Sequence, residues 1–153
     1  MRLVIRHGKS EGTRLNRDLF GKQGASLSEV GTKQAKELHF ELVKIGVDFN
    51  LPVAVSELLR THQTAELAGF SNMVVCPDLN EINTPNPPET IKNLTKGIIA
   101  PEALAAAKKL IASPPTESIW FTHGMLIAAL CHELGVVINT LVPDFCEVRE
   151  ITV

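Results

Sequence analysis

The most constraining feature of this sequence is the alternation of short apolar runs with helical patterns along most of its 153 residues. The apolar runs over residues 3–5, 53–55, 73–75 and 119–121 are continuous, as is typical of strands that are covered on both faces. Segments with helical spacing of their apolar residues separate these runs. The alternation predicts an α/β fold with a mostly parallel sheet flanked by helices on both faces.

The helical pattern is clearest between Ser28 and Ile45, where apolar residues recur at spacings of three and four. Ser28 is expected to cap this helix, and Gly46 is expected to end it. The remaining expected elements are helices over residues 58–68, from Pro101 onward and over 125–134, a proline-rich loop over 83–88, and a last edge strand over 148–153. We find no internal repeat or linker, so residues 1–153 are expected to form one domain.

The composition excludes several classes of partner. The net charge of −2 gives no overall basic field for binding nucleic acid. No apolar stretch approaches the roughly 20 residues that a membrane-spanning helix needs. Cys76, Cys131 and Cys146 are an odd set without CxxC spacing, which is typical of reduced thiols in the cytoplasm. We therefore expect a cytoplasmic protein that binds neither nucleic acid nor membrane.

Two histidine–glycine pairs follow predicted strands, and they begin at His7 and His123. Because ligands in such sheets bind beyond the carboxyl ends of the strands, both histidines are expected at the same edge. Arg6 precedes the first pair, and Arg60 lies at the start of the helix that follows another strand. Guanidinium groups present planar sets of donors that match phosphate oxygens. The pattern therefore predicts a phosphate site.

His7 is the candidate nucleophile of this site. A neutral imidazole can attack phosphorus and form a phosphohistidine, and an ordinary pKa of about 6.5 keeps much of it neutral at pH 7. His123 can donate to a phosphoryl oxygen at the start of its helix. Taken singly, each of these residues also fits an ordinary structural role. His7 could be a surface histidine and His123 a capping or core-edge histidine. Arg6 and Arg60 could be surface charges.

Glu81 is the candidate proton donor, because hydrolysis needs a group that protonates the leaving oxygen and later activates water. The alternative is a solvated acid in a loop. His39, His62 and His132 lie within predicted helices and are interpreted as surface or core-edge residues. No His/Cys/Asp cluster has the spacing of metal ligands, so we expect no metal.

Five segments in order resemble the motifs of the histidine phosphatase superfamily, also called phosphoglycerate mutase-like. These segments are Arg6–Gly12 (RHGKSEG), Leu27–Ala35 (LSEVGTKQA), Ser56–Ala65 (SELLRTHQTA), Leu79–Ile82 (LNEI) and Phe121–Gly124 (FTHG). The resemblance covers nearly the whole chain, and it implies a phosphoglycerate mutase-like fold.

The resemblance also implies roles for the matching residues. They are His7 as the phosphorylated nucleophile, Arg6, Arg60 and His123 as phosphoryl-binding groups, Glu81 as the proton donor, and Ser10 as a further polar contact near the phosphate. At Thr13 many members carry Asn, and the threonine hydroxyl can still donate to the phosphate. The resemblance implies no metal and no organic cofactor.

The segment between Glu81 and His123 is short, whereas larger members of the family insert helices there that cap the site. The chain is similar in size to small bacterial phosphohistidine phosphatases, and an open site is expected. An open site suits phosphohistidine on a protein or small phosphomonoesters. It suits a mutase poorly, because a mutase must protect its intermediate from water.

The sequence therefore predicts a metal-independent phosphatase that acts through a phosphohistidine at His7. The alternatives are a phosphoglycerate-type mutase and a regulatory module that binds a phospholigand with negligible turnover. The partner is expected to be a phosphorylated small molecule or a phosphoprotein, and nothing selects an oligomeric state. The loop-like residues 14–24 and 83–100 are expected to determine which substrate the protein accepts.

Overall fold

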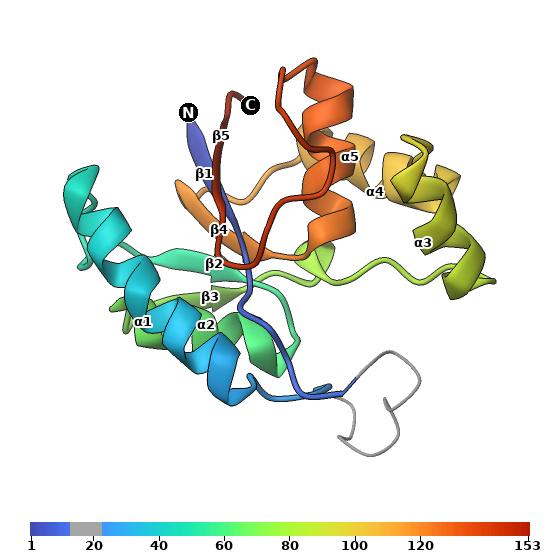
Figure 1. Cartoon of the computed structure of the whole chain (residues 1–153). Helices are drawn as coiled ribbons and strands as arrows, with labels where there is room; N and C mark the ends of the chain where they lie inside the picture. The colour runs from blue at the N-terminus through green and yellow to red at the C-terminus, as the bar shows by residue number, and fades with distance from the viewer. Residues whose placement is uncertain (13–22) are drawn as a thin grey trace.

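A central sheet with the strand order β3-β2-β4-β1-β5 organises the computed structural model, which describes residues 1–12 and 23–153 (Figure 1). The strands are β1 (Arg2–Arg6), β2 (Val53–Val55), β3 (Met73–Val75), β4 (Ile119–Thr122) and β5 (Val148–Ile151). Strands β1 to β4 run parallel, and β5 pairs antiparallel with β1 at one edge of the sheet. The predictions of a mostly parallel sheet and of a last edge strand are confirmed.

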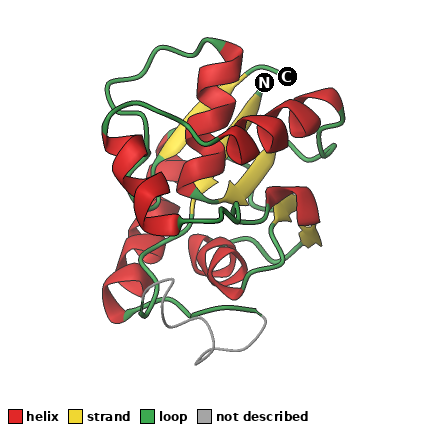
Figure 2. Ribbon diagram, turned by 90° about the vertical axis from the view of Figure 1, so that its right-hand side faces the viewer, coloured by secondary structure: helices red, strands yellow, loops and turns green. Residues whose placement is uncertain are grey.

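Helices cover both faces of the sheet (Figures 1 and 2). The described helices are α1 (Glu29–Lys44), α2 (Leu59–Ala68), the 3₁₀ helix η2 (Pro77–Leu79), α3 (Pro87–Thr95), α4 (Pro101–Ala112) and α5 (Gly124–Leu134). Helices α1 and α2 pack on one face, and α4 and α5 pack on the other. This arrangement leaves the carboxyl edge of the sheet to carry a site.

Alternating side chains along each strand fill the two layers of the core. Val4 and Trp120 contact the layer beneath α4 and α5, whereas Ile5 and Phe121 contact the layer beneath α1 and α2. Successive side chains of a strand point to opposite faces, so two adjacent buried residues serve two separate layers. Burial on both faces explains why these strands are continuous apolar runs in the sequence.

Close backbone contact fixes the segment after His7 against the start of α1. The Ser28 hydroxyl caps α1 by accepting from the Gly31 N–H at 3.0 Å. A Cβ atom on Gly31 would lie 1.9 Å from the Lys9 carbonyl oxygen, and one on Gly8 would lie 2.7 Å from the Gly31 oxygen. Both positions therefore require glycine because two backbones meet there.

Replacing Gly31 with alanine is expected to lower the free energy of unfolding by about 3 kcal/mol or more, because no flexible side chain can yield to the new methyl group. Urea denaturation would measure the loss. Val30→Ala, at an exposed position one residue earlier in α1, is the control and should change stability by less than about 0.5 kcal/mol. Equal midpoints for the two variants would contradict the close contact.

The segment after Glu81 is more helical than predicted. Helix α3 begins at Pro87, although residues 83–88 were expected to form a loop and the selectivity region up to residue 100 was expected to be loop-like. Asn86 caps α3, and its side chain accepts from the Glu89 N–H. Prolines in the first turn of a helix lose no hydrogen bond, so Pro87 and Pro88 start this helix rather than break it.

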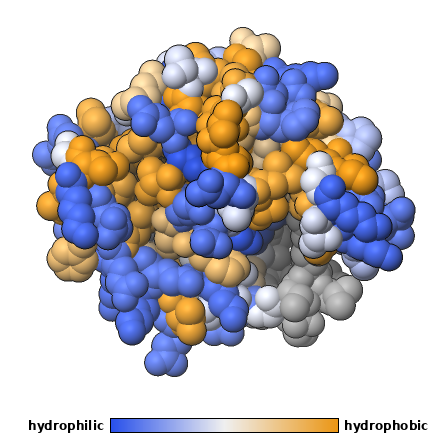
Figure 3. All heavy atoms as spheres, turned by 45° about the horizontal axis from the view of Figure 1, so that its top comes forward, coloured by the Kyte–Doolittle hydropathy of each residue, from blue (hydrophilic) through white to orange (hydrophobic). Residues whose placement is uncertain are grey.

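The surface carries hydrophobic and hydrophilic residues side by side on the face shown in Figure 3.

The two chain ends lie next to each other, because Arg2 in β1 pairs with Ile151 in β5 (Figure 1). Within residues 1–12 and 23–153, none of the helices has the length and apolar character needed to cross a membrane.

Candidate active site

His7 and His123 meet at the carboxyl edge of the sheet. Strands β1 and β4 are parallel neighbours with Arg6 opposite Thr122, so the residues that follow them are adjacent. The two imidazole ring centroids lie 5.1 Å apart. The exposed fractions are 4 % for His7 and 0 % for His123. The structure thus brings together the two histidines that were predicted to share one edge.

The surroundings of His7 define which nitrogen carries its proton. Nδ1 lies 2.6 Å from the Gly8 carbonyl oxygen, which only accepts, so Nδ1 carries the hydrogen. The guanidinium of Arg60 donates from Nε to His7 Nε2 at 3.1 Å, so Nε2 presents a lone pair. Burial, reinforced by the nearby charges of His123 and Arg60, lowers the pKa of His7 well below 6.5. His7 is therefore a neutral imidazole with its Nε2 lone pair facing the site.

The lowered pKa of His7 predicts that stability depends on pH. The unfolded chain, with an ordinary histidine pKa, binds more protons below pH 6.5 than the folded protein does. Wild type should therefore lose free energy of unfolding relative to His7→Asn as the pH falls below about 6.5. Urea denaturation of both proteins over a pH series would measure this difference. A difference that is constant with pH would contradict a neutral His7.

Arg60 lies in the first turn of α2 and reaches across the site. Its Nη2 lies 3.9 Å from Glu81 Oε2, and its side chain is 15 % exposed. The Thr64 hydroxyl donates to the Arg60 carbonyl oxygen and accepts from the Gly8 N–H at 3.0 Å. Helix α2 is thereby tied to the backbone beside His7, which holds the guanidinium next to the imidazole.

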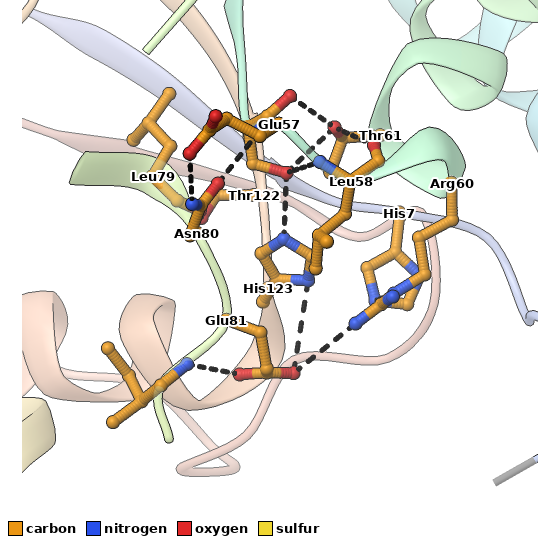
Figure 4. Close-up of polar contacts among 12 residues, drawn as sticks. His7, Glu57, Leu58, Arg60, Thr61, Leu79, Asn80, Glu81, Thr122 and His123 are labelled. Atoms are coloured by element: carbon orange, nitrogen blue, oxygen red, sulfur yellow. Dashed lines mark hydrogen bonds and ion pairs between the residues drawn. The ribbon is translucent and has the colours of Figure 1, made fainter. Parts of the chain in front are cut away.

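Glu81 follows η2 and places its carboxylate between Arg60 and His123 (Figure 4). Oε2 lies 3.8 Å from His123 Nδ1, and Oε1 accepts from the Ile82 N–H. The preceding residue, Asn80, exchanges two hydrogen bonds of 2.8 Å with Glu57. This exchange fixes the backbone from which Glu81 extends, so the carboxylate is directed into the site.

Ser56 is a buried residue of the site that lies outside the set predicted from the sequence. It follows β2, and its hydroxyl lies 2.9 Å from His123 Nε2 and 2.9 Å from the Thr61 hydroxyl. These contacts fix the orientation of the buried His123 ring. The available signal was its position directly after a buried strand, at the same edge as the two histidines.

Arg6 is held against the segment that precedes β5. Its Nη1 donates to the Pro143 carbonyl oxygen at 2.7 Å. Burial lowers the pKa of the Arg6 guanidinium, and the carboxylate of Glu81 is the strongest influence that raises it. Helix α5 begins one residue after His123, so its positive end faces the same region. The site therefore gathers several fixed positive groups around His7 Nε2.

The remaining predicted contacts concern two hydroxyl groups. Ser10 lies in the segment after His7, where it forms an isolated β-bridge with Leu27. Thr13 lies outside the described residues. Phosphate contacts of both residues stay predictions.

The other histidines lie at the helical positions expected for them. His39 and His62 hydrogen-bond to backbone oxygens of Ala68 and Ser56, and the side chain of His132 is 56 % exposed. Among the residues that the structure describes, no group of His, Cys, Asp and Glu side chains could hold a metal ion.

Residues 3–89 match the profile of the histidine phosphatase superfamily (branch 1). The chain belongs to this superfamily. The matched range contains His7, Arg60 and Glu81, and it ends before His123. Membership in the histidine phosphatase superfamily supports phosphatase- or mutase-type chemistry.

Solved structures of similar fold cover most of the chain. TTHB049 from Thermus thermophilus is 25 % identical with a TM-score of 0.65, over 94 % of this chain and 88 % of that one. The open reading frame Rv3214 from Mycobacterium tuberculosis is 20 % identical with a TM-score of 0.61. The match covers 95 % of this chain and 87 % of that one. The mycobacterial glucosyl-3-phosphoglycerate phosphatase Rv2419c is 22 % identical with a TM-score of 0.59. The match covers 89 % of this chain and 81 % of that one. A comparison with curated protein sequences gives no match.

Proposed function

We propose that the protein is a metal-independent phosphatase that hydrolyses phosphomonoesters or protein phosphohistidine through a phosphohistidine at His7. The observation that carries this proposal is the neutral His7, whose Nε2 lone pair faces Arg60. A nucleophile with an available lone pair beside fixed cations is what phosphoryl transfer requires.

In the first step, His7 Nε2 attacks phosphorus while the bond from phosphorus to the leaving oxygen breaks. For this attack, the hydrogen bond from Arg60 to His7 Nε2 must break. The Arg60 guanidinium then donates to the phosphoryl oxygens instead. Arg6, Arg60 and His123 stabilise the charge on the transferring group. Glu81, when it carries a proton, gives it to the leaving oxygen.

In the second step, water attacks the phosphohistidine. Glu81 accepts a proton from this water, the bond from phosphorus to Nε2 breaks, and the lone pair returns to His7. Inorganic phosphate leaves the site. No group other than water enters, so the cycle needs no further reactant.

The surroundings of the site favour hydrolysis over a mutase reaction. Between Glu81 and α4, the helix α3 has no buried residue, and the side chains of Glu81 and Arg60 remain partly exposed. A mutase must keep water away from its phosphohistidine, whereas a phosphatase must admit it. The similarity in fold to a glucosyl-3-phosphoglycerate phosphatase also supports phosphomonoester hydrolysis.

A phosphoester panel in EDTA tests this proposal. The panel should contain an aryl phosphate, an alkyl phosphate, a phosphoglycerate and a phosphohistidine peptide. We expect release of inorganic phosphate from at least one member. Isomerisation of the phosphoglycerate faster than phosphate release would favour a mutase. Phosphate binding without turnover of any member would favour a binding module.

A further inference from the structure

Phe145 lies over the guanidinium group of Arg6 and beside His7. The Arg6 Cζ atom is 4.1 Å from the centroid of the Phe145 ring, and the ring centroids of Phe145 and His7 are 6.1 Å apart. The face of an aromatic ring attracts a cation at this distance. Phe145 thus contacts a proposed phosphoryl-binding group and adjoins the proposed nucleophile, although no sequence motif includes it.

The backbone beside β5 directs Phe145 toward Arg6. The Arg6 N–H donates to the Glu147 oxygen, while the Arg6 oxygen accepts from the Cys146 N–H at 2.9 Å. Two residues of this segment therefore oppose one residue of β1, which is a β-bulge. Cys146 has a φ of 60°, a left-handed conformation that is unfavourable for a non-glycine residue. The fold maintains this strained bulge directly next to Phe145.

Gly124 and Pro143 complete a slot for the Arg6 side chain. A Cβ atom on Gly124 would lie 3.0 Å from Arg6 Nε, so the guanidinium lies tightly against the start of α5. Pro143 accepts from Nη1, whereas Nε has no hydrogen-bond partner among the described residues. Phe145, Gly124 and Pro143 therefore fix the plane of the guanidinium.

The buried Arg149 anchors the segment that carries Phe145. Its guanidinium donates to the carbonyl oxygens of Thr140 and Leu141 and to the Glu147 carboxylate. The other oxygen of that carboxylate accepts from the Asp144 N–H at 3.1 Å. Both ends of the segment are thus tied to β5, which fixes the backbone that carries the ring.

We propose that Phe145 is a positioning residue that orients Arg6 for binding the phosphoryl group. The proposal rests on the proposed phosphatase function, since it assigns Arg6 to the phosphoryl group. Arg6 would bind phosphate in the ground state and in the transition state alike. Loss of Phe145 should therefore weaken phosphate binding more than it slows the chemical step.

The test compares Phe145→Ala, Phe145→Leu and Phe145→Tyr by 4-nitrophenyl phosphate kinetics and by calorimetric binding of inorganic phosphate. The alanine and leucine variants should raise KM and the phosphate Kd by roughly 5- to 30-fold, with a smaller change in kcat. Tyrosine keeps the ring and should stay within about threefold of wild type. Phe40→Ala, at an exposed position of α1, is the matched control and should change neither constant.

A second comparison asks whether Phe145 acts through Arg6. In an Arg6→Ala background, Phe145→Ala should change KM by less than about twofold. The leucine variant keeps most of the apolar volume, so it decides the question even if the alanine variant fails to fold. A leucine variant that matches wild type, or an undiminished effect in the Arg6→Ala background, would overturn the proposed role.

The two proposals fail in different ways. Wild-type turnover with unchanged KM and Kd in every Phe145 variant would overturn the positioning role and leave the phosphatase proposal intact. Phosphate binding without turnover would overturn the phosphatase proposal, and the binding constants would still decide the role of Phe145. A wild-type protein that neither binds phosphate nor turns over any ester would overturn both.

Discussion

Replacing His7 with alanine is expected to reduce kcat/KM for a phosphoester by at least about 10³-fold, because the group that forms the covalent intermediate is removed. The variant lacks the neutral ring that presents its Nε2 lone pair to the site. A phosphoryl label trapped on the protein during turnover should also disappear. Steady-state kinetics in EDTA and a rapid-quench labelling experiment would measure both effects.

His132→Ala is the matched control for this experiment, since that imidazole is exposed on α5 and far less buried than His7. The control should keep wild-type activity and labelling. The His7 variant should still bind inorganic phosphate, because Arg6, Arg60 and His123 remain. Persistence of a labelled protein in His7→Ala would show that another residue is the nucleophile.

The placement of His7 and His123 could be predicted because it depends on a regular property of parallel sheets. Each histidine follows a buried apolar run, and parallel strands end at one edge. The sequence did not show that β1 and β4 are direct neighbours, which is a property of the strand order. That order, rather than any local signal, brings the rings within 5.1 Å.

The role of Phe145 could not be predicted, because it depends on pairing between distant segments. Its contact with Arg6 requires the antiparallel pairing of β5 with β1 and a bulge at Cys146, and neither has a local signature in the sequence. Helix α3 was not predicted, for a different reason. Its two leading prolines favour a loop when they are considered alone, although the capping Asn86 before them is a signal for a helix start.

Hydrogen bonds among neighbouring residues orient the polar groups of the site. Glu81 is fixed through the pairing of Asn80 with Glu57, and His123 is fixed through Ser56. These contacts come from the residues that follow β2 and η2, so they do not involve helix α3. The reacting groups are therefore ordered before a substrate binds.

Glu81→Gln is expected to slow phosphorylation of His7 by an alkyl phosphate by roughly 10²-fold or more, because an alkoxide leaves poorly without a proton. The same step with nitrophenyl phosphate should slow much less, since nitrophenolate leaves readily. The amide keeps the size of the side chain and can still accept from the Ile82 N–H. Pre-steady-state bursts are the appropriate measurement, because they isolate phosphorylation from the later hydrolysis of the intermediate.

Glu11→Gln is the control, since Glu11 is the next carboxyl in the motif around His7 and is exposed. It should affect both esters equally and weakly. Equal slowing of both esters by Glu81→Gln would mean that Glu81, placed 3.8 Å from His123 and 3.9 Å from Arg60, positions the pocket without donating a proton. Leaving-group dependence in the Glu11 variant instead would move the role of general acid to that residue.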